Sequence, residues 1–219
     1  PGTPQITGMR AGLIAGQPTL FYGTLEKLFT YDEVNKVVEK GSGYTGQLDQ
    51  TATQRATRWS FGSWGEWIVA SNGQDALQIS KDAGSFSNLA GTPPTYAECL
   101  VTWSPHMLAF NTDDGGNFIG WCNADDVEDW VATQSNTAGG LYIRELSSDI
   151  IAALTLQDRP IFLTRNELGV VNYQGPPFVF GAEVVLYGIG AVGKDSVVAV
   201  GNQIFGFGPR GIWISDGST

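Results

Sequence analysis

The chain has 219 residues, and its 12 Lys and Arg against 22 Asp and Glu give a formal net charge of -10. With 42% hydrophobic and 16% charged residues, it has enough apolar material for a core and too little charge for a disordered chain. The excess of acidic residues argues against a groove that binds nucleic acid, because phosphate binding needs Lys and Arg. No apolar run approaches the roughly 18 residues of a membrane-spanning helix.

Five segments of the sequence repeat one pattern, in which two β-rich runs flank a short polar or glycine-containing turn and a third apolar run follows. The 29 glycines and 11% aromatic residues are typical of short strands joined by many turns. The apolar runs that follow the turns are, in chain order, residues 20–22, 67–69, 107–110, 161–163 and 204–207. The third runs are residues 27–31, 76–79, 118–121, 169–173 and 211–214.

Equivalent positions in these segments recur every 40–53 residues, which is typical of the repeat of a β-propeller blade. We take these positions to be Phe21, Val69, Ala109, Phe162 and Phe205. A small twisted sheet buries both of its apolar faces only when it stacks between other sheets. The sequence therefore predicts an all-β fold, with residues 1–219 forming a single β-propeller or a propeller fragment of about five antiparallel repeats. The repeats are residues 11–31, 57–90, 97–130, 149–180 and 195–219.

The last repeat ends before a fourth strand, which leaves two ways to complete it. Either residues 5–10 supply the outer strand, or the chain is part of a larger propeller with further blades. Residues 24–35 are rich in Leu, Glu and Lys and would suit a helix, but we expect strand and hairpin because their position matches the other repeats. Residues 125–130 could form one helical turn.

A glycine-rich segment at residues 188–193, with the sequence GIGAVG, follows an apolar run and resembles a dinucleotide-binding fingerprint. The β-branched and glycine-containing residues 195–208 cannot plausibly form the helix that this site needs. The segment also approaches a P-loop, but Asp195 stands where a Ser or Thr should bind magnesium, and its carboxylate would repel phosphate. We therefore interpret residues 188–194 as a connection between the fourth and fifth repeats.

Residues 80–86, with the sequence SKDAGSF, resemble the Asp-box turn of sialidase-type propellers, and residues 215–219 resemble it more weakly. In such a turn the Asp side chain accepts backbone N–H bonds and the glycine takes a positive φ. The role is structural. A glycosidase would also need an arginine cluster and paired carboxylates, and the arginines do not recur at one place in the repeat.

The remaining reactive side chains are few. His106, the single histidine, follows Pro105 in a predicted turn, where we expect it to be solvated. Cys99 and Cys122 fall on the first and third strands of one repeat, roughly 10 Å apart at the usual strand spacing. That distance exceeds disulfide reach, so we expect two free thiols in a reduced interior.

Acidic clusters at residues 32–33, 113–114 and 125–129 are compatible with calcium, but they lack EF-hand spacing, and we interpret them as solvated loop charge. We expect the tryptophans to pack between blades rather than to form a sugar platform. They are Trp59, Trp64, Trp67, Trp103, Trp121, Trp130 and Trp213. We predict no catalytic, cofactor-binding or metal-ligating residue, and therefore no cofactor and no enzymatic activity.

Four stretches, taken in order, resemble propeller-type structural proteins of tailed bacteriophages. They are WIVASNGQDALQ at residues 67–78, FSNLAGTPP at 86–94, WCNADDVEDW at 121–130, and a glycine-rich ending over 188–217. The resemblance covers about residues 8–217, and relatives with this pattern are longer. It implies a virion protein of the neck or tail, of the tail-nozzle, tail-hub or packaged-DNA-stabilisation type, with no catalytic residues.

The resemblance implies a homo-oligomer that is made in the host cytoplasm and assembles with other copies and with neighbouring tail or neck proteins. An acidic surface would let packaged DNA pass without sticking, because like charges suppress phosphate contacts. A propeller binding module for a host glycan or a partner protein is the alternative function, and an Asp-box glycosidase is the third.

Overall fold

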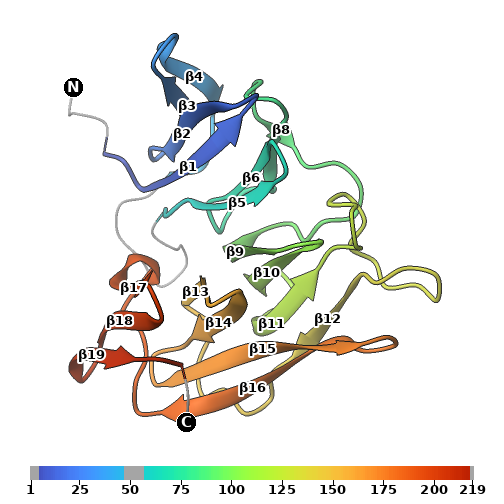
Figure 1. Ribbon diagram of the computed structural model, residues 1–219, viewed down its shortest axis with the longest axis vertical. Coiled ribbons are helices and arrows are strands. Elements are labelled where there is room, and N and C mark those ends of the chain that lie inside the picture. Colours follow the sequence, from blue (N-terminus) through green and yellow to red (C-terminus); the bar gives the residue numbers. More distant parts are fainter. Residues whose placement is uncertain (1–4, 47–56, 218–219) are drawn as a thin grey trace. The chain divides into compact units, whose positions relative to one another are not determined.

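The computed structural model describes residues 5–46 and 57–217, and in these residues the chain forms five antiparallel sheets (Figure 1). They fall into two compact units. The first holds the residues up to Ala90 together with Thr95–Ala97, and the second holds Gly91–Pro94 and the residues from Glu98 onward. The all-β class with five blade-like antiparallel repeats, predicted from the sequence, is confirmed.

The first unit contains two four-stranded sheets, in which strands that are neighbours in sequence pair as hairpins. One hairpin pairs Ile14 with Gln17, and its two-residue turn places both Ala15 and Gly16 at positive φ. The first sheet consists of β1 (Gly8–Ile14), β2 (Gln17–Gly23), β3 (Lys27–Asp32) and β4 (Lys36–Ser42). The second consists of β5 (Ser60–Trp64), β6 (Trp67–Ser71), β7 (Gln78–Ser80) and β8 (Ser87–Asn88).

The first and second sheets pack through one buried cluster. Phe21 and Leu28 of the first sheet contribute to it, with Trp59, Phe61 and Ile68 from the second sheet and its approach. The indole Nε1–H of Trp59 donates to the carbonyl oxygen of Thr24 at 2.7 Å. The predicted packing of tryptophan between blades is confirmed for Trp59.

The second unit contains three sheets. The third sheet consists of β9 (Ala97–Trp103), β10 (His106–Thr112), β11 (Gly115–Trp121) and β12 (Gly139–Tyr142). The fourth consists of β13 (Ala152–Leu156), β14 (Arg159–Leu163), β15 (Glu167–Gly175) and β16 (Val179–Tyr187). The short 3₁₀ turn η1 (Lys194–Ser196) leads into the fifth sheet, which consists of β17 (Val197–Val200), β18 (Gln203–Gly208) and β19 (Gly211–Ser215).

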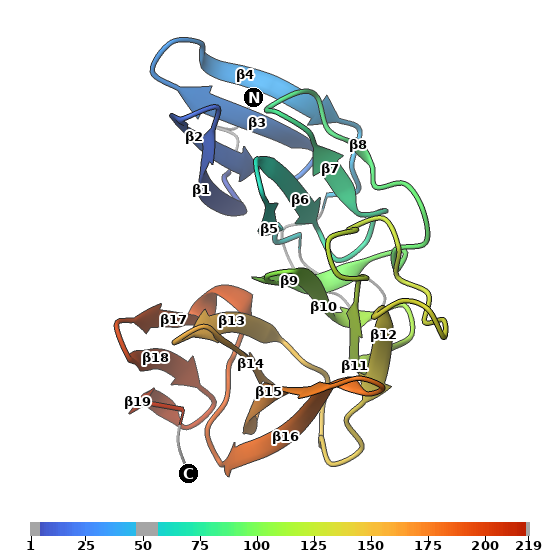
Figure 2. The ribbon, with the colours of Figure 1, turned by 45° about the vertical axis from the view of Figure 1, so that its right-hand side comes forward.

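The fourth sheet is covered on both faces, as a propeller blade requires (Figure 2). Successive side chains of a strand point to opposite faces, so Ile161 and Phe162 of β14 face different neighbours. Phe162 belongs to the cluster shared with the third sheet, where its ring centroid lies 6.4 Å from that of Phe110. Ile161 belongs to the cluster shared with Ile204 of the fifth sheet. This packing explains why the strand is apolar on both sides.

Two local expectations are settled by strand pairing. Residues 27–32 form β3 rather than a helix, as predicted. The suggestion that residues 5–10 complete the fifth sheet is wrong, because β1 pairs with β2 from Gly8↔Gly23 to Ile14↔Gln17. The backbone groups of β1 are therefore used within the first sheet, and among the described residues the fifth sheet has three strands.

Residues 125–130 form turns and a bridge between Asn123 and Asp126 rather than a helical turn. The described part of the chain contains no helix long and apolar enough to cross a membrane.

Candidate binding surface

The fifth sheet has two apolar faces, of which one is covered. Ile204 is fully buried against the fourth sheet, together with the half-buried Val197, Ala199 and Trp213. The opposite face carries six large apolar side chains, which we call the open face. They are Val198, Val200, Phe205, Phe207, Ile212 and Ile214.

Strand register gathers the open face into rows. Val198 pairs with Phe205, which pairs in turn with Ile214, and Phe207 pairs with Ile212 in the next row. Five of the six side chains are more than half exposed, and Ile212 reaches 83%. Phe205, which we took as the repeat position equivalent to Phe21 and Phe162, lies half-buried on this face, and its neighbour Ile204 is buried instead.

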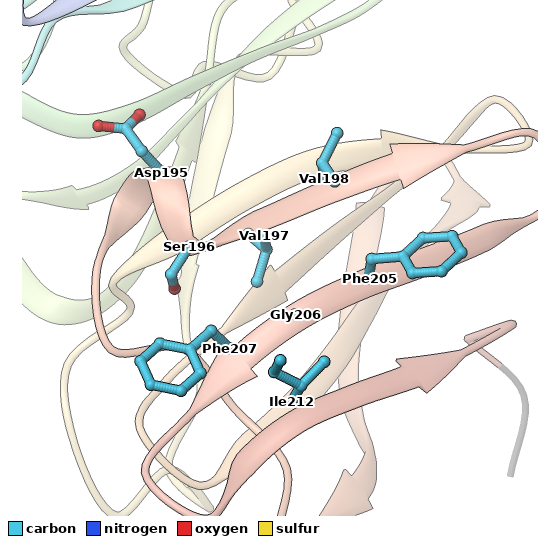
Figure 3. A pocket seen from close by; sticks show the side chains of 8 residues that line it. All are labelled: Asp195, Ser196, Val197, Val198, Phe205, Gly206, Phe207 and Ile212. Atoms are coloured by element: carbon cyan, nitrogen blue, oxygen red, sulfur yellow. The ribbon is translucent and has the colours of Figure 1, made fainter.

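A shallow, open hollow of about 340 Å³ lies on this face (Figure 3). Val198, Phe205, Phe207 and Ile212 line it, together with Asp195 and Ser196 of η1. A wide apolar depression with so few polar groups suits a complementary apolar surface better than a small polar substrate.

The glycine-rich connection at residues 188–194 makes contacts that fix the position of the fifth sheet. Trp213 Nε1–H donates to the carbonyl oxygen of Gly190 at 2.8 Å, and Lys194 pairs with the mostly buried Glu98 of β9 at 3.3 Å. A Cβ on Gly190 would lie 2.3 Å from the backbone of Arg165, so this glycine allows the close approach. Residues 188–193 join the fourth and fifth sheets, as predicted, and the three-residue η1 is followed by the antiparallel β17.

His106 is not the solvated turn residue that the sequence suggested. It begins β10 and is 5% exposed, with Nε2 3.0 Å from Thr137 Oγ1 and its ring 5.0 Å from that of Phe180. Burial lowers the pKa of His106 from its ordinary value, and the nearby Asp125 carboxylate opposes that shift. Sequence reasoning missed this because the turn that precedes β10 ends one residue earlier than expected.

We expect His106 to make folding pH-dependent. Because its folded-state pKa is depressed below 6.5, the unfolded chain binds the proton more readily. The stabilising effect of neutral His106 is fully present at pH values above the pKa of His106 in the unfolded chain. It is lost as the pH falls below that value toward the pKa of the folded state. Urea midpoints measured from about pH 8 to pH 5 should fall more steeply for the wild type than for His106→Gln. Parallel profiles would contradict this.

Cys99 and Cys122 are both buried free thiols, as predicted. Cys99 lies on β9 and Cys122 directly follows β11, and β10 lies between these two strands. Burial raises the pKa of each thiol to about 12. The thiolate is the reactive form, so we expect a thiol reagent to label neither cysteine in the native protein and both in urea. Rapid native labelling of either would show that the third sheet opens.

Residues 80–84 form a turn, but its backbone differs from that expected of an Asp box. Asp82 and Ala83 take the positive φ angles, at 53° and 57°, instead of Gly84. The turn is closed by Ser80 Oγ–H, which donates to the Gly84 carbonyl at 2.8 Å, and by the Gly84 N–H to the Lys81 carbonyl at 2.8 Å.

The acidic clusters serve in part as turn caps. Asp32 accepts backbone N–H bonds from Val34 and Asn35, and the hydrogen bonds from Asn35 lower its pKa. Asp126 accepts the N–H of Glu128. Within residues 5–46 and 57–217, no group of three or more His, Cys, Asp or Glu side chains could hold a metal ion.

The motifs behind the phage resemblance form structural loops. Asn72 Oδ1 accepts the N–H groups of Gln74 and Asp75 between β6 and β7, and Gly73 has a positive φ. The Asp75 carboxylate accepts the N–H and hydroxyl of Thr45 at 2.6 and 2.8 Å.

The motif at residues 121–130 is organised in the same way. Asn123 Oδ1 accepts the N–H and the hydroxyl of Thr137, each at 3.0 Å. Trp130 Nε1–H donates to the carbonyl of Val127 at 2.6 Å. These polar side chains are engaged in closing loops.

No protein-family model and no curated protein matches the chain. Among solved structures it is similar to BBS1N in two crystals in complex with ARL6DN, with TM-scores of 0.58 and 0.56 and 15% and 14% identity. These matches cover 97% of this chain and 61% and 62% of BBS1N.

A further match is PorZ, a bacterial surface component of the type-IX secretion system of Porphyromonas gingivalis. Its TM-score is 0.52 at 10% identity, and the match covers 98% of this chain and 27% of PorZ. The fold is a β-propeller, and the chain spans about three fifths of the BBS1N chains it matches.

Proposed function

We propose that this chain is a structural subunit of a tailed-phage virion, in the tail or neck, and that it acts by binding proteins without catalysing a reaction. The observation that carries the binding role is the open face, because six apolar side chains on one sheet are costly to leave in water. The virion setting is supported by the ordered motifs of the sequence.

The chemistry of these motifs supports a structural role. Asn72, Asp75 and Asn123 use their side chains to close loops, and none of them is left to act on a substrate in the described loops. The fold neighbour BBS1N was solved in complex with ARL6DN, so a protein of this fold can act through protein binding.

Purified particles of the tailed phage that encodes this chain provide the test. We expect its peptides in the mass spectrum of washed particles, and immunogold label at the neck or tail by electron microscopy. Label on the capsid shell, or absence of the protein from particles that contain every other tail protein, would overturn the virion role.

The alternative, a host-glycan binding module, makes a different prediction. The open face is built mainly from aliphatic side chains and has few polar groups, whereas a sugar site needs hydrogen-bonding groups beside its aromatic rings. Specific, saturable signal on a glycan array would favour the glycan module over the assembly role.

The net charge of -10 bears on the proposed passage of DNA. We expect no retardation of duplex DNA by the protein in a gel at low salt, because like charges repel most strongly there. Binding that weakens steeply as salt rises would reveal a basic phosphate-contacting surface and would contradict non-sticking passage.

A further inference from the structure

We draw no further inference here: the strongest candidate, the tip of the β15–β16 hairpin in the second unit, where Phe178 is 71% exposed beside the positive φ of Val179, is an apolar surface patch for which nothing in the structure shows what covers it.

Discussion

Replacing Phe162 with alanine is expected to lower the free energy of unfolding of the second unit by about 3–5 kcal/mol. Phe162 is fully buried between the third and fourth sheets, close to the ring of Phe110. A Cβ on Gly169 would lie 2.1 Å from Phe162 Cζ, so the glycine leaves the space that the ring fills. Alanine would open a cavity that the paired strands can close only partly.

Urea titrations followed by circular dichroism measure this effect, with Phe178→Ala as the matched control. Phe178 is 71% exposed in the turn between β15 and β16, so its truncation should change stability by less than about 0.5 kcal/mol. Equal midpoints for the two variants would mean that the third and fourth sheets do not pack through Phe162.

Trp59→Ala is expected to destabilise the first unit by a similar amount, about 3–5 kcal/mol. Trp59 is 3% exposed. A Cβ on Gly23 would lie 2.1 Å from Trp59 Cδ1, so the indole ring packs directly against this glycine. Its removal also leaves the carbonyl of Thr24 without the indole donor, which adds the cost of an unsatisfied buried acceptor. Trp59→Phe should recover part of the packing and none of this hydrogen bond.

Trp67→Ala is the matched control, because Trp67 is half-buried and its ring is covered on one side by the Lys81 ammonium at 4.4 Å. An exposed cation–π contact is worth about 0.5–1 kcal/mol, so this variant should lose much less stability. If Trp59→Ala and Trp67→Ala unfold at the same temperature, the stability of the buried cluster does not depend on Trp59.

The sequence predicted the sheets well because strand signals are local. Alternating apolar residues and turn residues such as Gly16 determine where each hairpin lies, whatever packs against it. The same local information argued against an α-helix after Gly193, where the three-residue η1 is followed by β17. The free thiols at Cys99 and Cys122 followed from strand order alone.

The errors concern residues whose surroundings come from distant parts of the chain. His106 was assigned to solvent because its neighbours form a turn, but it is buried against Phe180 and Thr137, which lie far along the sequence. Residues 5–10 were candidates for the fifth sheet, but β1 pairs with β2. Pairing partners and burial depend on contacts that no local pattern encodes.

The amino-acid sequence by itself therefore determined that this protein is all-β, in five antiparallel repeats whose strands are apolar on both sides. Only the tertiary structure decided which of those apolar sides are covered: Ile204 is buried against the fourth sheet, while Ile212 and Phe207 face solvent. The reason is physical. Because successive side chains point to opposite faces, the sequence shows that a strand has two apolar faces. Whether each face is buried depends on the sheet that packs against it.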